Sequence, residues 1–97
     1  MAKGYIIVRV DVSDPEAYGR YAKATAVAVE KFGAKPLARG GRYEALEGPS
    51  RSRNVIMEFE SYEQAKAYYH SDEYQAAREH RLGAAEGEFV VVEGFDS

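Results

Sequence analysis

Short apolar runs along the chain alternate with segments in which apolar residues recur every three or four positions. Residues 5–10, 55–59 and 89–92 are runs rich in β-branched and aromatic side chains, a pattern typical of strands, and residues 34–39 add a fourth strand. The segments after the first and third runs carry apolar stripes with a helical period. The pattern therefore predicts the order β-α-β-β-α-β.

The first helix has signals at both ends. Ser13 or Asp14 can cap its amino end, and Pro15 suits the first turn because the backbone N–H that proline lacks would have no partner there. Gly33 follows the last apolar position of the stripe, and glycine readily adopts the left-handed conformation that ends helices. We therefore expect one helix of about five turns.

The second helix begins with Ser61 and Gln64, which have the spacing of a capping box. Ser71 precedes two acidic residues and has the character of a second cap, so the helix should bend or restart at this serine. It should then continue to about Ala85, and Gly87 should end it. Between the second and third strands, the pattern breaks at two glycines, and residues 42–46 could continue the strand as a hairpin extension.

This order of elements is that of the ferredoxin-like α+β fold, a four-stranded antiparallel sheet with two helices on one face. The length of 97 residues fits one domain, residues 1–97. The strand runs are continuously apolar, which indicates that both faces of the sheet are buried. Two helices can cover only one face, so we expect a second copy of the chain to cover the other, in a homodimer. The alternative is a monomer that tolerates a few exposed apolar side chains.

Composition excludes several classes of function. The chain has no cysteine, which excludes disulfides, thiolate nucleophiles and cysteine-ligated metal sites. The net charge of −3 argues against binding to nucleic acid, and no apolar run is long enough to cross a membrane. The amino-terminal segment has no apolar core of signal-peptide length, so we expect a cytoplasmic protein. The two histidines, ten residues apart, do not have metal-ligand spacing, and we expect no metal or other cofactor.

The sequence also resembles the family named domain of unknown function 1330, within the dimeric α/β-barrel superfamily. The resemblance covers nearly the whole chain and rests on nine short segments. These are Lys-Gly-Tyr at 3–5, Val-Asp-Val at 10–12, Asp-Pro-Glu-Ala-Tyr at 14–18, Leu-Ala-Arg-Gly-Gly at 37–41, Leu-Glu-Gly at 46–48, Glu-Phe at 58–59, Tyr-His-Ser at 69–71, Glu-Tyr-Gln-Ala at 73–76 and Val-Glu-Gly at 92–94. The resemblance implies a homodimer in which two sheets close into one barrel with the helices outside. It implies no reaction, because the superfamily includes monooxygenases, isomerases, dehydratases and haem-handling enzymes.

Charged residues within the apolar strands are the first candidates for chemistry. Arg9 and Asp11 share a face of the first strand, where they could pair with each other or form the wall of a polar cavity. Glu58 lies in the third strand, which neighbours the first in this topology, so a Glu58–Arg9 pair is plausible. Glu58 is also our candidate for a general acid or base.

The segment from Arg39 to Arg53 is locally basic within an acidic protein. Arginine suits carboxylates and phosphates, so Arg39 or Arg53 could anchor an anion site at the mouth of a barrel. The alternative is a solvated hairpin, which we favour for Arg42 and Arg51. We take Arg39 as a ligand-binding candidate because it lies inside a strand.

His70 lies at the expected break in the second helix, where it could act as a general base or as a proximal haem ligand. A histidine there could equally satisfy a terminal carbonyl group or meet solvent. The chain also has eight tyrosines. Tyr18, Tyr21 and Tyr69 lie on or beside the helical stripes, where they either pack in the core or form an aromatic pocket with their phenols as donors.

These candidates support three functions. The first is a homodimer that binds or transforms a small acidic or aromatic metabolite in a cavity beside the sheet. Glu58 and His70 would be its catalytic residues, with Arg9, Arg39 and the three tyrosines as ligand-binding residues. The second is a noncatalytic structural or interaction dimer whose charges only fix the register. The third is haem handling, which rests on His70 alone.

Overall fold

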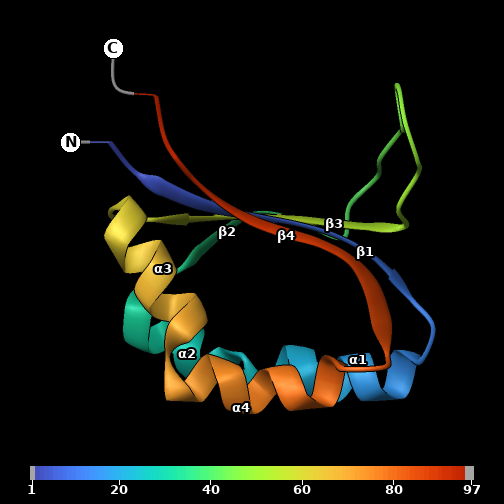
Figure 1. Ribbon diagram of the computed structural model, residues 1–97, viewed down its shortest axis with the longest axis horizontal. Coiled ribbons are helices and arrows are strands. Elements are labelled where there is room, and N and C mark those ends of the chain that lie inside the picture. The colour runs from blue at the N-terminus through green and yellow to red at the C-terminus, as the bar shows by residue number, and fades with distance from the viewer. Residues whose placement is uncertain (1, 96–97) are drawn as a thin grey trace.

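Four antiparallel strands form one sheet in the order β2-β3-β1-β4 (Figure 1). The strands are β1 (Gly4–Val12), β2 (Lys35–Arg39), β3 (Arg53–Phe59) and β4 (Ala85–Glu93). The computed structural model describes residues 2–95. The predicted order of elements and the ferredoxin-like α+β fold are confirmed, and β1 and β3 are the central pair.

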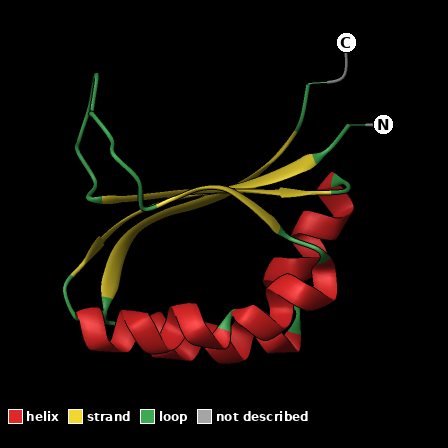
Figure 2. Cartoon of the chain, turned by 180° about the vertical axis from the view of Figure 1, so that it is seen from behind, coloured by secondary structure: helices red, strands yellow, loops and turns green. Residues whose placement is uncertain are grey.

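All the helices lie on one side of the sheet (Figure 2). They are α1 (Pro15–Ala24), α2 (Ala26–Phe32), α3 (Tyr62–His70) and α4 (Asp72–Arg81). Each of the two predicted helices is thus divided into two segments. No helix within residues 2–95 is long and apolar enough to cross a membrane.

The two interruptions have different local causes. Thr25 keeps helical backbone angles, but its hydroxyl donates to the Ala22 carbonyl oxygen at 2.7 Å, a type of bond that bends helices. This interruption was not predicted. Ser71 adopts an extended conformation, and its hydroxyl oxygen accepts from the Tyr74 backbone N–H at 3.0 Å. The predicted cap at Ser71 is confirmed, as is the cap of α3 by Ser61, whose hydroxyl accepts from the Gln64 N–H at 3.0 Å.

Two predicted boundaries are wrong. The last helix ends at Arg81 rather than near Ala85, and Gly83, with a φ of 82°, makes the turn into β4. Ala85 already pairs with Val12 of β1, so strand pairing prevails over the helix propensity of alanine. The hairpin extension over residues 42–46 does not form, because pairing of β2 with β3 stops at Arg39 and residues 40–52 form a loop that projects from the sheet (Figure 1).

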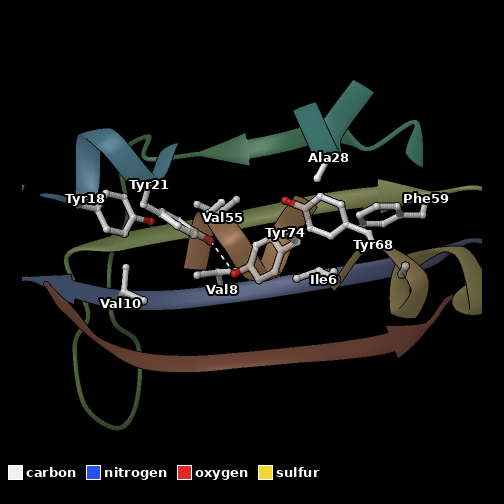
Figure 3. Close-up of a cluster of buried hydrophobic side chains, with 12 residues drawn as sticks. Ile6, Val8, Val10, Tyr18, Tyr21, Ala28, Val55, Phe59, Tyr68 and Tyr74 are labelled. Carbon is white, nitrogen blue, oxygen red and sulfur yellow. Dashed lines mark hydrogen bonds between the residues drawn. The ribbon is translucent and has the colours of Figure 1, made fainter. Parts of the chain in front are cut away.

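The core lies between the sheet and the helices (Figure 3). Alternate side chains of β1 and β3 point into it, because successive residues of a strand face opposite sides. Aromatic rings from the helices lie over them in a row. The buried residues shown are Ile6, Val8, Val10, Tyr18, Tyr21, Ala28, Val55, Phe59, Tyr68 and Tyr74.

The opposite face of the sheet is covered by no element within residues 2–95 and carries apolar side chains at its centre. Ile7 pairs in register with Ile56 on one side and Val90 on the other. Ile56 is 37% exposed, Val90 is 51% exposed and Val92 is 43% exposed. In the single chain, the sheet is therefore open and one face is apolar but uncovered.

The structure gives Gly87 a role other than ending a helix. It pairs with Val10, and a Cβ atom at Gly87 would lie 1.9 Å from the Arg9 carbonyl oxygen. We predict that Gly87→Ala lowers the free energy of unfolding by about 1–3 kcal/mol, because the strands would have to separate to accommodate the methyl group. Urea denaturation measures this effect.

Gly19 provides the matched control, because it lies in the middle of α1 with open space around it. Gly19→Ala should raise the free energy of unfolding by about 0.5–1 kcal/mol, since alanine loses less backbone entropy in a helix. A Gly87→Ala protein as stable as the parent would contradict the close approach of β4 to β1.

Candidate functional site

The seven residues proposed from the sequence lie in three separate places. One group lines a cavity between α1 and the β2–β3 edge of the sheet, a second lines a groove beside β4, and a third lies on the open face. The groups are Tyr18, Tyr21 and Arg39; Tyr69 and His70; and Arg9 and Glu58.

The first place, which we call the α1 cavity, has a volume of about 410 Å³. Its apolar walls come from the sheet, with Val8, Val55 and Met57, and from the helices, with Ala22 and Val29. Tyr18 and Tyr21 of α1 and Tyr68 of α3 add aromatic rings. The cavity thus has the mixed apolar and aromatic lining typical of sites for small organic ligands.

Three cationic side chains also line the α1 cavity: Lys23 of α1, Arg39 of β2 and Arg53 of β3. No carboxylate is among the residues that line it. Within residues 2–95, none of the three cations forms a salt bridge or a side-chain hydrogen bond. The cavity therefore concentrates positive charge in a chain whose net charge is −3.

Arg53 is held in place by packing alone. Its guanidinium carbon lies 5.4 Å from the centroid of the Tyr18 ring, a cation–π distance. On another side it lies close to Gly40, where a Cβ atom would be 2.6 Å from Nη1 of Arg53. Gly40 also has a φ of 70°, so both its backbone conformation and the nearby guanidinium favour glycine. The Nε–H of Arg53 is buried without an acceptor in the described part of the chain, as are those of Arg51, Arg78 and Arg81.

Arg39 faces the α1 cavity because of an irregularity in β2. The register of β2 against β3 shifts between Pro36 and Ala38, and Arg39 then pairs with Val55, whose side chain is in the core. The sequence placed Arg39 in a strand but could not give the side on which it lies. Lys23 was missed altogether, because a lysine on a helix reads as solvated until the packing of α1 on the sheet is known.

On the open face, the expected Glu58–Arg9 pair is wrong. The register pairs Glu58 with Tyr5 and Arg9 with Asn54. The Tyr5 hydroxyl donates to Glu58 at 3.1 Å, and this bond raises the pKa of Tyr5. Arg9 donates to the Asn54 side-chain oxygen at 3.4 Å and to the Pro49 carbonyl oxygen at 2.8 Å, so it braces the projecting loop.

The alternative pairing of Arg9 with Asp11 is also wrong, because Arg51 binds Asp11 instead. Arg51 lies 3.0 Å from the Asp11 carboxylate and 2.6 Å from that of Glu88, while the Ser52 N–H donates to Asp11 at 2.9 Å. Arg51 was expected to be solvated. Its contacts instead hold the carboxyl end of the projecting loop against β1 and β4.

The second place is a groove of about 270 Å³ between α3 and β4. His70 is exposed at the end of α3, and its ring lies edge-on to Tyr69 with centroids 5.2 Å apart. Glu58 is not among the residues that line this groove. The two residues proposed as catalytic are therefore not brought together. In the described part of the chain, no three histidine or acidic side chains converge to hold a metal ion.

The contacts of Asp11 give a prediction about acid sensitivity. The Ser52 N–H and Arg51 lower its pKa. Because the folded pKa lies below the unfolded value of about 3.9, the stabilisation is present above that pH and is lost as the pH falls through the folded pKa. An NMR titration should give a midpoint for Asp11 below 3.9.

The difference in the free energy of unfolding between the parent and Asp11→Asn should become smaller as the pH falls from about 5 to 3. Glu44→Gln changes a carboxylate in the exposed part of the loop and should show no such trend. A normal or raised midpoint for Asp11 would contradict the Arg51 and Ser52 contacts.

Comparison with known proteins places the fold among small proteins that are mostly uncharacterised. A protein of unknown function from Rhodopseudomonas palustris superposes with a TM-score of 0.77 at 19% identity, over 99% of this chain and 85% of that one. A protein from Bacteroides fragilis, described as dimeric with a ferredoxin-like fold, gives 0.61 at 15% identity, over 97% and 96%. A candidate antibiotic biosynthesis monooxygenase from Caulobacter crescentus gives 0.60 at 16% identity, over 99% and 90%.

At these identities the similarity establishes the fold alone. A comparison with curated proteins finds no match. The family described as "Domain of unknown function (DUF1330)" matches residues 3–95, which is nearly the whole chain. The resemblance seen in the sequence is therefore confirmed, and the chain belongs to this family.

Proposed function

We propose that the protein binds a small aromatic or apolar carboxylic acid in the α1 cavity. The observation that carries the proposal is the side chain of Arg53, which lines the cavity without a salt bridge within residues 2–95 while its guanidinium is fixed against Tyr18 and Gly40. A charge at the wall of a cavity normally has a partner, so a guanidinium without a carboxylate nearby favours a ligand that supplies one.

The chemistry of the cavity supports a carboxylate. A guanidinium group donates two parallel hydrogen bonds to a carboxylate, and such charge-assisted bonds are among the strongest in proteins. Arg39 and Lys23 add positive charge, and no acidic side chain in the lining competes for it. The apolar walls and the tyrosine rings suit an aromatic body on the same ligand.

A purely structural role for these charges is the competing explanation, and the open face provides the comparison. Arg51, Asp11 and Glu88 compensate one another and tie a loop to the sheet. Arg53 and Arg39 have no such partners within residues 2–95. Charges that only fix register are expected to be paired, so the cavity arginines favour ligand binding over the noncatalytic alternative.

The proposal extends to binding and not to a reaction. Glu58 and His70 stay predicted catalytic residues, although neither lines the α1 cavity. Haem handling finds less support, because the groove beside His70 has only about 270 Å³, below the usual range for cofactor sites.

The ligand proposal is tested by calorimetric titration with benzoate and 4-isopropylbenzoate. Arg53→Gln should bind them about tenfold or more weakly, since a hydrogen bond to a charged group contributes about 1.5–3 kcal/mol. Arg42→Gln removes an arginine from the exposed loop, outside the cavity, and should leave the affinities unchanged. Affinities that do not change in Arg53→Gln, or a parent protein that binds neither acid, would overturn the proposal.

We also propose that the protein is a homodimer in which the open face of one sheet packs on that of the partner. The apolar side chains of Ile56, Val90 and Val92 are exposed together at the centre of this face. Clusters of this kind mark interaction surfaces. The neighbour of known fold from Bacteroides fragilis is described as dimeric, which supports the same assembly here.

For the dimer, light scattering coupled to size-exclusion chromatography should give twice the chain mass of 10.8 kDa. Ile56→Glu should shift the protein to the monomer, because the packing of two open faces would bury a carboxylate without a partner. Val27→Glu places the same charge on an exposed position of α2, on the helical side, and should leave the dimer intact. A parent protein that runs as a monomer at micromolar concentration would contradict the assembly.

A further inference from the structure

The α1 cavity carries a second polar group, the phenol of Tyr68, which the carboxylate proposal does not use. Tyr68 lines the cavity from α3 and is only 2% exposed. Its ring is fixed on several sides, at centroid distances of 5.1 Å from Phe59, 5.1 Å from Tyr74 and 6.3 Å from Phe32. The side chain is therefore held rigidly among other rings.

The Tyr68 hydroxyl has no hydrogen-bond partner within residues 2–95, unlike the two phenols beside it. Tyr21 and Tyr74 bond to each other through their hydroxyls at 2.8 Å, deep in the same core. The Tyr68 oxygen points away from Phe59 and toward the part of the row where Val55 lies (Figure 3). Val55 also lines the cavity, so the phenol is aimed at the cavity rather than at solvent.

The Tyr68 oxygen is not among the fully enclosed polar atoms without a partner, so it is open to the cavity that the side chain lines. Tyrosine hydroxyls in such settings usually find a partner. The ring cannot swing the hydroxyl into bulk water without disturbing its contacts with Phe59 and Tyr74. Burial also raises the pKa of Tyr68, so the group stays a neutral O–H donor at physiological pH. What the site lacks is an acceptor within the cavity.

We propose that the ligand of the α1 cavity carries a second oxygen, a carbonyl or hydroxyl group apart from its carboxylate, and that Tyr68 donates a hydrogen bond to it. Arg53 and Arg39 then hold the anionic end, while Tyr68 selects an oxo- or hydroxy-substituted aromatic acid over the plain aromatic acid. This inference rests on the proposed function, because it requires the carboxylate to bind in the same cavity.

The test compares matched probes that differ in one acceptor. Acetylbenzoate and isopropylbenzoate have nearly the same shape, but only the acetyl group has a carbonyl oxygen. Both are titrated as their meta and para isomers, so that the position of the second oxygen is sampled. One acetyl isomer should bind the parent protein about three- to tenfold more tightly than its isopropyl counterpart, the range expected for one neutral hydrogen bond.

Tyr68→Phe should abolish that preference while leaving the affinity for isopropylbenzoate within about twofold of the parent value, because only the hydroxyl is removed. Tyr62→Phe is the matched control on the same helix, since Tyr62 lies outside the cavity, and it should keep the preference. Circular dichroism and thermal unfolding confirm that both variants are folded.

The outcomes separate the two proposals. If isopropylbenzoate binds with the predicted dependence on Arg53 but no acetyl isomer binds more tightly, the Tyr68 inference is wrong and the carboxylate site stands. The inference is equally wrong if the preference survives in Tyr68→Phe, as it would if an ordered water satisfied the phenol in every complex. If no aromatic acid binds, the proposed function itself fails.

Discussion

The structure depends on the burial of one face of a four-stranded sheet beneath two interrupted helices. Because successive strand residues face opposite sides, this burial divides every strand into two sets of side chains. Ile6, Val8 and Val10 enter the core, while Ile7 lies between them on the other face. Nothing in the described part of the chain covers that second face, so its apolar centre remains as an interaction surface.

The same packing leaves the α1 cavity where the helices meet the β2–β3 edge. The chain satisfies most of its buried polar groups by simple local means, such as the serine caps of α3 and α4 and the hydroxyl pair of Tyr21 and Tyr74. Arg53 and the Tyr68 hydroxyl both belong to the cavity lining, and within residues 2–95 Arg53 has no salt bridge and the hydroxyl no hydrogen-bond partner. Polar groups left without partners in otherwise consistent packing are typical of functional sites. Two such donors in one cavity are more informative than the fold, which proteins of several functions share.

Local sequence signals predicted the elements well because they act over a few residues. The strand runs and the caps at Ser61 and Ser71 depend on neighbours within four positions, and each is confirmed. The signals failed where a distant strand decides the outcome. Residues around Ala85 have helix propensity, but pairing with Val12 draws them into β4.

The candidate site was harder to predict from the sequence, because it too depends on residues that are distant along the chain. The Glu58–Arg9 pair required a register that no local pattern reveals, and the side on which Arg39 lies depends on one irregularity in β2. The tyrosines of α1 and an arginine anchor were recognised by residue type. Their convergence with Lys23 and Tyr68 follows only from how the helices pack on the sheet.

The central claim is that an aromatic carboxylate binds at Arg53, and the most direct measurement is an NMR titration that follows the arginine side-chain Nε–Hε signals as benzoate is added. The account predicts that the Arg53 signal moves downfield in a saturable way, as a new charge-assisted hydrogen bond forms. The signal of Arg51, which lies outside the cavity and is held by Asp11 and Glu88 through Nη1 and Nη2, should stay in place. An Arg53 signal that does not move, or equal shifts for both arginines, would contradict the account.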